Sequence, residues 1–372
     1  MKHTTLACFQ GFQCMAGSCP DSCCRAGWEI VIDPRTMDRV KLLPGPDAAR
    51  VRSAVVDGEE PIWQNRDGVC TLLDPDGLCH LQRHYGPEAL CRVCRDYPRF
   101  RRFYGARTEH GLSLSCPEAL RLLLRPGADL SPVSWEDNAP IEPNDLDAET
   151  WLLLQEGRAA ALALLRREDL PAEDRFLLVL ELAARLDPEQ VIRPRRALSR
   201  LRSPIGQRAV RLRAPRFQDM TRYRHLADWV EAYLELEILS AAWRSRLERL
   251  QDFVRRAPEE DHYRAERYEF CRIRPQEIYV RYFYGQLWKF WMDACAEGHL
   301  LAVVKRALAG TLLLRELHLM EYIQKTGADP LQPMYQLSRE TEHSEQNLSA
   351  LLDRMDGSVC FSRKAFFAMI RL

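Results

Sequence analysis

Lysine and long apolar segments are both scarce in this chain of 372 residues. Only six of its 53 basic residues are lysine; the rest are arginine. No apolar stretch approaches the ~20 residues that a membrane-spanning helix needs, and the N-terminal residues lack the apolar core of a signal peptide. We therefore expect a cytoplasmic protein, and disulfide bonds are rare in that compartment.

A net charge is absent too, because 53 acidic residues balance the basic ones. This balance argues against a protein that coats nucleic acid with its whole surface. It conceals a dipolar middle, since residues 126–192 carry a net charge of −10 and residues 193–224 carry +10. We interpret the arginine-rich block 193–224 either as a solvated face or as a surface for an acidic partner. No two glycines form a G-x-G pattern, so the fingerprint of a Rossmann-type nucleotide site is missing.

Cysteine is abundant, and its distribution divides the chain. Ten of the 13 cysteines lie between residues 8 and 116, in a part punctuated by turn signals and poor in periodic segments. Proline and acidic residues dominate the next segment, and helical periodicity follows it. We predict a mainly α fold, with a loop-rich cysteine-cluster domain at 1–125, a linker or strap at 126–147 and an all-helical domain at 148–372.

Apolar residues at three- and four-residue spacing predict the helices of the last domain. The predicted helices cover 148–167, 172–186, 223–256, 276–296, 300–323 and 340–355. Aromatic residues crowd the segment 279–291 at helical spacing, which favours packed core over a ligand cage.

The cysteines form two groups whose chemistry points to a metal. The first group has the spacing C-x4-C-x3-C-C from Cys14 to Cys24, and the second runs as C-x8-C-x11-C-x2-C from Cys70 to Cys94, with Cys116 beyond. Structural disulfides need an oxidising compartment, and unligated buried cysteines do not account for ten thiols so close together. A metal centre is therefore the favoured interpretation.

Zinc and an iron–sulfur cluster both remain open on these residues. Structural zinc sites favour paired C-x2-C motifs, and only Cys91 and Cys94 form one. Irregular spacing with a vicinal pair fits a cluster better. His80, His84 and His110 lie among the cysteines and could ligate either metal, although a packing or surface role is commoner for each.

The cysteine motifs carry a family resemblance together with their neighbours. Gly27-Trp28 follows the first group, and the later segments read Cys94-Arg95-Asp96-Tyr97-Pro98-Arg99 and Leu112-Ser113-Leu114-Ser115-Cys116-Pro117-Glu118. These motifs resemble the flagellin lysine-N-methylase family over about the first third of the chain. The N-terminal part also resembles a broader class of iron- or zinc-chelating cysteine-cluster domains.

The resemblance implies a cytoplasmic enzyme that methylates surface lysines of flagellin with S-adenosylmethionine and a 4Fe–4S cluster. The metal-binding cysteines carried over from the family are Cys14, Cys19, Cys23, Cys24, Cys70, Cys79, Cys94 and Cys116. Cys8 and Cys91 are additions and rank lower. Flagellin is the expected partner and nucleic acid is not, while peripheral membrane association and oligomerisation stay open.

The mechanism is left open by the motifs. The C-x3-C-x2-C loop of most radical S-adenosylmethionine enzymes is absent, because Cys24 directly follows Cys23. One hypothesis is a cluster whose open iron binds the methyl donor; the other is a polar displacement that needs a base. Tyr97, Glu109 and Glu118 are the candidate bases, each with a commoner structural role, and no catalytic or donor-binding residue is assigned.

Two functions without methylation compete with this hypothesis. The first is a zinc-stabilised protein-interaction module, and the second is an iron–sulfur electron-transfer protein. The identity of the metal separates the zinc module from the other two.

Overall fold

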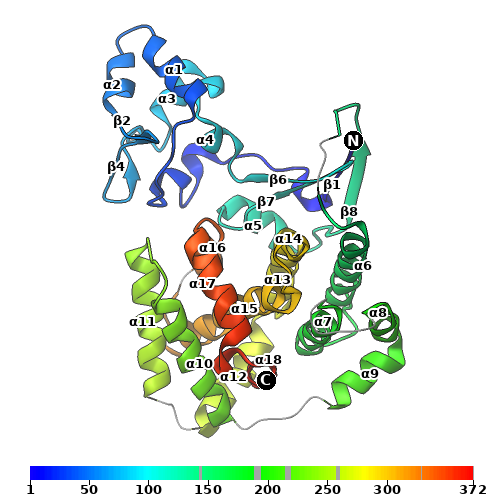
Figure 1. The fold of residues 1–372 in the computed structure, drawn as a ribbon. Helices are drawn as coiled ribbons and strands as arrows, with labels where there is room; N and C mark the ends of the chain where they lie inside the picture. The colour runs from blue at the N-terminus through cyan, green and yellow to red at the C-terminus, as the bar shows by residue number, and fades with distance from the viewer. Residues whose placement is uncertain (142–144, 188–193, 214–218, 257–259, 328, 372) are drawn as a thin grey trace.

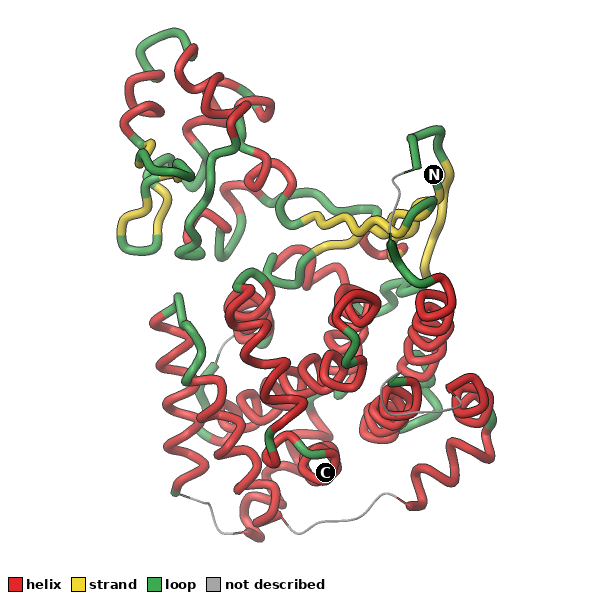
Figure 2. Tube along the Cα trace, in the orientation of Figure 1, coloured by secondary structure: helices red, strands yellow, loops and turns green. Residues whose placement is uncertain are grey.

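A computed structural model describes residues 1–141, 145–187, 194–213, 219–256, 260–327 and 329–371 (Figure 1). Helices make up most of these residues and strands are few and short, as Figure 2 shows, which confirms the mainly α prediction. Among the described helices, none combines the length and the apolar character needed to cross a membrane.

A four-stranded sheet lies toward the upper right of Figure 1, above the large group of helices. Its strands are β1 (Lys2–Leu6), β6 (Arg99–Tyr104), β7 (Arg107–Leu112) and β8 (Pro132–Glu136), in the order β6-β7-β1-β8. β1 pairs with β7 in parallel and with β8 antiparallel, and β6 and β7 form a hairpin. The chain therefore leaves the sheet after Leu6 and returns to it at Arg99.

Residues 10–98, which we call the N-terminal lobe, form the blue and cyan part at the upper left of Figure 1. Its helices and strands are short: α1 (Pro34–Leu42), α2 (Ala48–Ser53), α3 (His80–Tyr85), α4 (Arg92–Asp96), β2 (Val55–Val56), β3 (Ile62–Trp63), β4 (Asn65–Arg66) and β5 (Val69–Cys70). A separate small core that includes Trp63, Leu72 and Leu81 holds them together.

The remaining helices form one body around α15, which is buried along almost its whole length. They are α5 (Pro117–Leu124), α6 (Ala148–Leu165), α7 (Ala172–Leu186), α8 (Pro194–Arg202), α9 (Pro204–Arg213), α10 (Asp219–Leu234), α11 (Ala241–Arg255), α12 (Glu260–Ile273), α13 (Glu277–Phe290), α14 (Ala294–Glu297), α15 (Leu300–Ile323), α16 (Leu331–Glu342), α17 (Glu345–Gly357) and α18 (Arg363–Ile370). The large core also includes Leu6 and residues of α5. The domain boundary predicted near residue 125 stays a prediction.

The long helix predicted over 223–256 is wrong, because the chain turns between α10 and α11. The Glu340 carboxylate accepts hydrogen bonds from the backbone N–H groups of Leu239 and Ser240, at 2.8 and 2.9 Å. Ser240 then caps α11 by accepting from the N–H of Trp243. A buried carboxylate from a distant helix thus satisfies donors that a continuous helix would have bonded internally.

The helix predicted over 340–355 is also interrupted. α16 ends at Glu342, and α17 begins at Glu345 behind Ser344, which caps it by accepting from the N–H of Asn347. Serine competes for backbone donors and so favours a helix start over a helix interior. The predicted helix 276–296 ends early as well, because α13 stops at Phe290 and a short 3-10 turn follows.

Candidate metal centre

All eight cysteines of the predicted metal set line one cavity of about 270 Å³. Cys14 and Cys19 flank a 3-10 turn, and Cys23 and Cys24 begin another. Cys70 ends β5, Cys94 lies in α4, and Cys79 and Cys116 stand immediately before α3 and α5. Seven of the thiols come from the N-terminal lobe, and the eighth comes from the helical body.

The walls of this cavity fit a soft metal centre. Cys14, Cys23 and Cys94 are exposed residues on the walls of the cavity. The thiols share the walls with apolar side chains that include Phe12, Leu72 and Leu81. Thiolates in an apolar, water-poor surround are the donors that zinc and iron–sulfur clusters take.

Two adjacent thiol pairs concentrate negative charge on one member of each pair. The Cys23 thiol donates a hydrogen bond to Cys24, which lowers the pKa of Cys24 and raises that of Cys23. Cys91 and Cys94 form an equivalent pair, in which the pKa of Cys91 is lowered. A thiolate rather than a thiol is the metal ligand, so Cys24 of the first pair is a ready donor in the cavity, whereas Cys91 of the second pair lies in the small core of the lobe.

Mutual repulsion connects the cavity thiols in two overlapping sets of neighbours, since Cys23 of the first set also acts on Cys94 of the second. In the first set, the charges of Cys14 and Cys116 act on Cys23, and that of Cys14 also acts on Cys19. In the second set, the charge of Cys24 acts on Cys70, Cys79 and Cys94. Burial is the largest cause that raises the pKa of Cys70 and Cys116 to about 11 each, so both need a bound cation to become thiolates. The vicinal pair Cys23-Cys24 joins the two sets.

The two lower-ranked cysteines lie elsewhere. Cys91 is fully buried in the small core of the lobe and contacts Cys94 and Trp63. Cys8 lies in the large core, where burial raises the pKa of its thiol to about 12. Neither lines the cavity as the structure describes it.

The three histidines singled out in the sequence are not among the residues described as lining the cavity. His110 Nε2 lies 2.9 Å from His3 Nδ1 beside the four-stranded sheet. His80 and His84 face Asp47 on another side of α3.

The candidate bases lie in three different settings. Tyr97 lines the cavity, and burial raises its pKa well above the usual range. Glu118 also lines the cavity but makes a bidentate ion pair with Arg121. Glu109 is bound by Arg158 in a buried ion pair beside α6. Of the three, Tyr97 is the one that faces the cavity without a cationic partner of its own.

A polar network that the motifs did not reveal continues from Tyr97 into the helical body. The Tyr97 hydroxyl lies 3.0 Å from Ser115 Oγ, which lies 2.8 Å from His343 Nε2. The His343 ring packs against Trp28 and Tyr97, with ring centroids 4.8 and 6.0 Å apart. Loss of surrounding water, followed by the charge of Lys289, lowers the pKa of His343, so its imidazole is neutral at neutral pH.

The network ends at a buried ion pair. Ser113 donates to Glu342 Oε2 at 2.6 Å, and Lys289 Nζ binds the same oxygen at 2.7 Å. Burial opposes ionisation of Glu342, but the adjacent Lys289 outweighs it and lowers the pKa of Glu342 to about 2. The only signal for these residues in the sequence is Ser113-Leu114-Ser115 beside Cys116.

Arg339 in α16 ties the cysteine loop to the helical body. Its guanidinium pairs with Asp21 Oδ1 at 2.8 Å and donates to the backbone oxygens of Asp21 and Ser115. Asp21 lies between Cys19 and Cys23, and Ser115 precedes Cys116. One buried side chain therefore positions both sides of the first thiol set.

The arginine block lies far along the chain from these residues, in α8 and α9. Arg196 and Arg200 line a cavity of about 610 Å³ together with Arg185 and Arg363, both of which pair with Glu181. Residues 193 and 214–218 of the block fall outside the described residues. Within the block, Arg211 pairs with Asp174 at 3.1 Å, so the block is partly neutralised where it is described.

Sequence comparison adds relatives of known name. The chain is 33% identical over 124 residues to the flagellar biosynthetic protein FliU of Salmonella muenchen, a match that takes in 30% of this chain and 71% of FliU. The chain belongs to the FliU family. It is also 33% identical over 124 residues to the lysine-N-methylases of Salmonella choleraesuis and Salmonella typhimurium. The match to this member of the FliU family spans 30% of each lysine-N-methylase.

No protein-family model matches the chain. No solved structure matches it either.

Proposed function

We propose that this protein is a protein-lysine N-methyltransferase that acts on flagellin, with S-adenosylmethionine as methyl donor and a 4Fe–4S cluster in the cysteine cavity. The observation that carries the proposal is the convergence of eight thiols from both parts of the molecule on one cavity. The names of the relatives, lysine-N-methylase and flagellar biosynthetic protein, support the reaction and the substrate.

Either thiol set supplies the four ligands that a 4Fe–4S cluster requires. We favour the set Cys24, Cys70, Cys79 and Cys94, because the thiolate Cys24 lies beside the other three. When bound, a cluster held by only three of these four thiols would leave one iron open for the amino and carboxylate groups of the donor, and that iron would polarise the sulfonium. Cys23 and the remaining thiols of the first set would then form the opposite wall.

Methyl transfer requires a neutral amine, because the nitrogen lone pair must form the new bond. The N–CH3 bond forms as the C–S bond of the sulfonium breaks, and the electron pair of that bond stays on sulfur as a thioether. A substrate lysine that arrives as ammonium must first lose one proton. The chain therefore has to accept that proton or exclude the water that stabilises the charge.

The network behind Tyr97 offers hydrogen-bonding partners for the neutral amine. Tyr97, Ser115 and His343 form hydrogen bonds of 2.8–3.0 Å in sequence, and the His343 imidazole is neutral. Ser113 links the same network to the Glu342–Lys289 pair. We assign Tyr97, Ser115 and His343 to orienting the amine in its neutral form, because the lowered pKa of His343 makes its imidazole a poor proton acceptor. The lysine proton is lost to solvent before the amine enters the cavity.

The test is a methylation assay under anaerobic conditions. The purified chain is reconstituted with iron and sulfide, then incubated with S-adenosylmethionine and flagellin of the same organism. Mass spectrometry is expected to show flagellin peptides heavier by whole methyl additions at lysine. The double variant Cys23→Ala/Cys24→Ala is expected to lose the cluster absorbance and the methylation together, whereas Cys295→Ala, whose thiol lies outside the cavity, retains both.

Other outcomes would replace the proposal. A colourless protein with stoichiometric zinc and no methylation would indicate the interaction module. A cluster that cycles between redox states without methylating flagellin would indicate electron transfer. Full methylation by the double variant would exclude a role for the cavity.

A further inference from the structure

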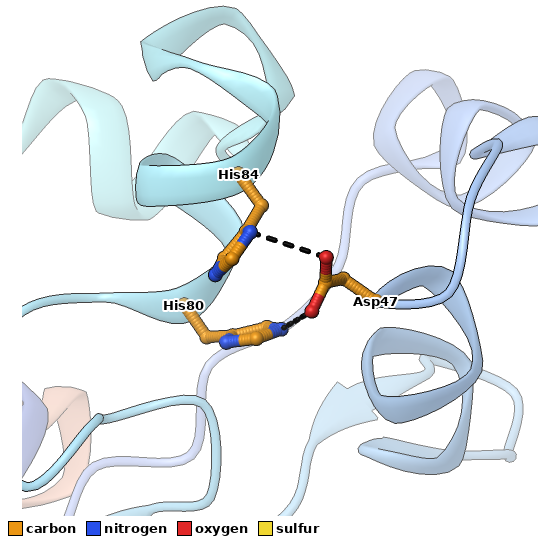
Figure 3. A group of neighbouring side chains, drawn as sticks. All are labelled: Asp47, His80 and His84. Carbon is orange, nitrogen blue, oxygen red and sulfur yellow. Dashed lines mark ion pairs between the residues drawn. The ribbon is translucent and has the colours of Figure 1, made fainter.

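Asp47, His80 and His84 place three potential metal ligands in one compact group, which Figure 3 shows between α2 and α3. Their ligand atoms all lie within 4.8 Å of one another. His80 Nε2 is 3.5 Å from Asp47 Oδ1, and His84 Nδ1 is 3.2 Å from Asp47 Oδ2. The two histidines are four residues apart at the start of α3, so one helical turn stacks them on the same face.

His80 gives the first sign that this group binds something. The residue is only 5% exposed, and its Nε2 is a buried nitrogen without a hydrogen-bond partner in the structure. A buried polar atom without a partner destabilises the folded protein. That atom points toward the Asp47 carboxylate (Figure 3), whose Oδ1 is 3.5 Å away, and a ligand held between them would give it a partner.

Asp47 gives the second sign. It occupies the position before the first residue of α2, where an aspartate normally accepts a hydrogen bond from a backbone N–H of the first turn. Its side chain makes no such bond. The carboxylate is turned toward the two imidazoles instead.

The spacing of the three ligand atoms fits one transition-metal ion. Zn²⁺ bonds to nitrogen and oxygen at about 2.0–2.2 Å, and tetrahedral angles then separate neighbouring ligand atoms by roughly 3.3–3.5 Å. The distances from Asp47 to His80 and His84 are 3.5 and 3.2 Å. Because all three ligand atoms lie within 4.8 Å of one another, any pair has to close by at most about 1.5 Å to bind one ion.

The other ring nitrogen of His80, Nδ1, also has a carboxylate nearby. It lies 3.4 Å from Oδ1 of the buried Asp74, and Asp74 is fixed by Arg50 at 2.7 Å and by Arg83 at 3.3 Å. A histidine that ligates a metal usually donates its other ring N–H to a carboxylate, which fixes the tautomer. Arg50 Nη1 also lies 3.1 Å from Nδ1 and can only donate to it, so metal binding at Nε2 requires Nδ1 to change from accepting from Arg50 to donating to Asp74.

We propose that Asp47, His80 and His84 form a binding site for one divalent transition-metal ion of the zinc class, separate from the cysteine cavity. Two imidazoles and one carboxylate supply three ligands, and water completes the shell because Asp47 and His84 are about one-third exposed, at 38% and 35% of their side chains. The ion joins α2 to the first turn of α3, and Cys79 of the cavity directly precedes that turn.

X-ray absorption of the zinc-loaded full-length chain tests the site without a substitution. Zinc at this site has nitrogen and oxygen neighbours, whereas zinc in the cavity has sulfur neighbours about 0.2–0.3 Å farther away. The expected spectrum contains both shells after the cavity thiols have been filled. A spectrum with sulfur neighbours alone, at saturating zinc, would overturn the proposal.

Two variants locate the nitrogen and oxygen shell. His84→Ala and the isosteric Asp47→Asn are each expected to bind one zinc ion fewer per chain and to keep the sulfur shell. The matched control is Asp356→Asn, which removes the exposed carboxylate that pairs with His299 at 3.5 Å; it is expected to keep the full zinc content. Equal zinc content in all four proteins would show that the group is an ion pair only. None of these measurements depends on methylation, so this site and the proposed function stand or fall separately.

Discussion

A cysteine becomes a metal ligand or a nucleophile only as a thiolate, and its neighbours in this chain decide which cysteine ionises first. Cys23 donates to Cys24 and thereby stabilises the Cys24 thiolate, although the two are adjacent in sequence. Burial raises the pKa of Cys70 to about 11 and keeps its thiol protonated. The cavity therefore presents unequal donors before any metal arrives.

Alkylation of the metal-free protein measures this inequality. Cys24 is expected to react with iodoacetamide at pH values below those at which an ordinary thiol reacts, because its pKa is lowered. Cys23→Ala removes the donated hydrogen bond and is expected to shift the reaction of Cys24 to higher pH; Cys14→Ala, as the control, leaves it in place. Peptide mass spectrometry across a pH series measures the alkylation of Cys24 in the unmodified chain and in both variants. Equal pH dependence of Cys24 in all three proteins would contradict the paired-thiol interpretation.

A second residue-scale prediction concerns the buried His318. Burial lowers its pKa to about 3, and its Nδ1 lies 2.8 Å from the Tyr279 hydroxyl. In the unfolded chain the His318 imidazole becomes protonated near pH 6.5, whereas in the folded chain it stays neutral down to about pH 3. Protonation therefore favours the unfolded chain, and the free energy of unfolding falls as the pH falls from about 6.5 toward 3. In His318→Gln the free energy of unfolding, measured with urea, is expected to fall less between pH 7 and pH 5 than in the unmodified chain. The exposed-site control His299→Asn is expected to keep the original slope.

At the scale of elements, the sequence predicted helices well wherever their ends are set locally. α7 and α15 begin and end at the residues that periodicity indicated. The break between α10 and α11 depends instead on Glu340, which is 100 residues away from Ser240 along the chain. No local pattern reports such a distant partner.

The candidate site shows the same limit. Its cysteines could be identified from the sequence by residue type and spacing, because a metal centre needs one scarce kind of side chain. His343 could not be identified in this way, since it contacts Ser115, which is 228 residues away along the chain. The compact group at Asp47 was missed for a similar reason, because an aspartate before a helix normally indicates a cap.

The turn between α10 and α11 makes a testable element. Glu340→Ala removes the acceptor of two backbone N–H groups in a buried setting. The free energy of unfolding is expected to fall by about 2–4 kcal/mol, since each unsatisfied donor costs about 1–3 kcal/mol. Glu248→Ala on the exposed face of α11 serves as the control, with a change within about 0.5 kcal/mol. Denaturant unfolding measures the free energy of unfolding of both variants. An equal loss of that free energy in the two variants would show that the Glu340 carboxylate does not stabilise the turn.

At the scale of the whole molecule, the cavity is assembled by two cores at once. Seven thiols belong to the lobe, Cys116 belongs to the helical body, and Arg339 fastens one to the other. Arg339→Ala is expected to weaken metal binding in the cavity by about 10–100-fold, as is usual when support behind the ligands is lost. It is also expected to increase protease cleavage within residues 14–24.

The matched control for that prediction is Arg244→Ala, an exposed arginine of α11. Competition with a chelator gives the affinity, and limited proteolysis gives the exposure of the loop. Unchanged affinity in Arg339→Ala would mean that the lobe holds its thiols in place without the helical body.

The parallel pairing of β1 with β7 makes the lobe an insertion in the architectural sense. The chain departs after Leu6 and re-enters at Arg99 at the same end of the sheet, with only β7 between the two strands. Neighbouring strands are about 4.8 Å apart, so the two ends of the excursion are separated by roughly 10 Å. A linker of a few residues could bridge that gap, and the helical body without the lobe would keep α5 and the large core. Such a lobe can be gained, exchanged or lost in evolution without rebuilding the fold that carries it.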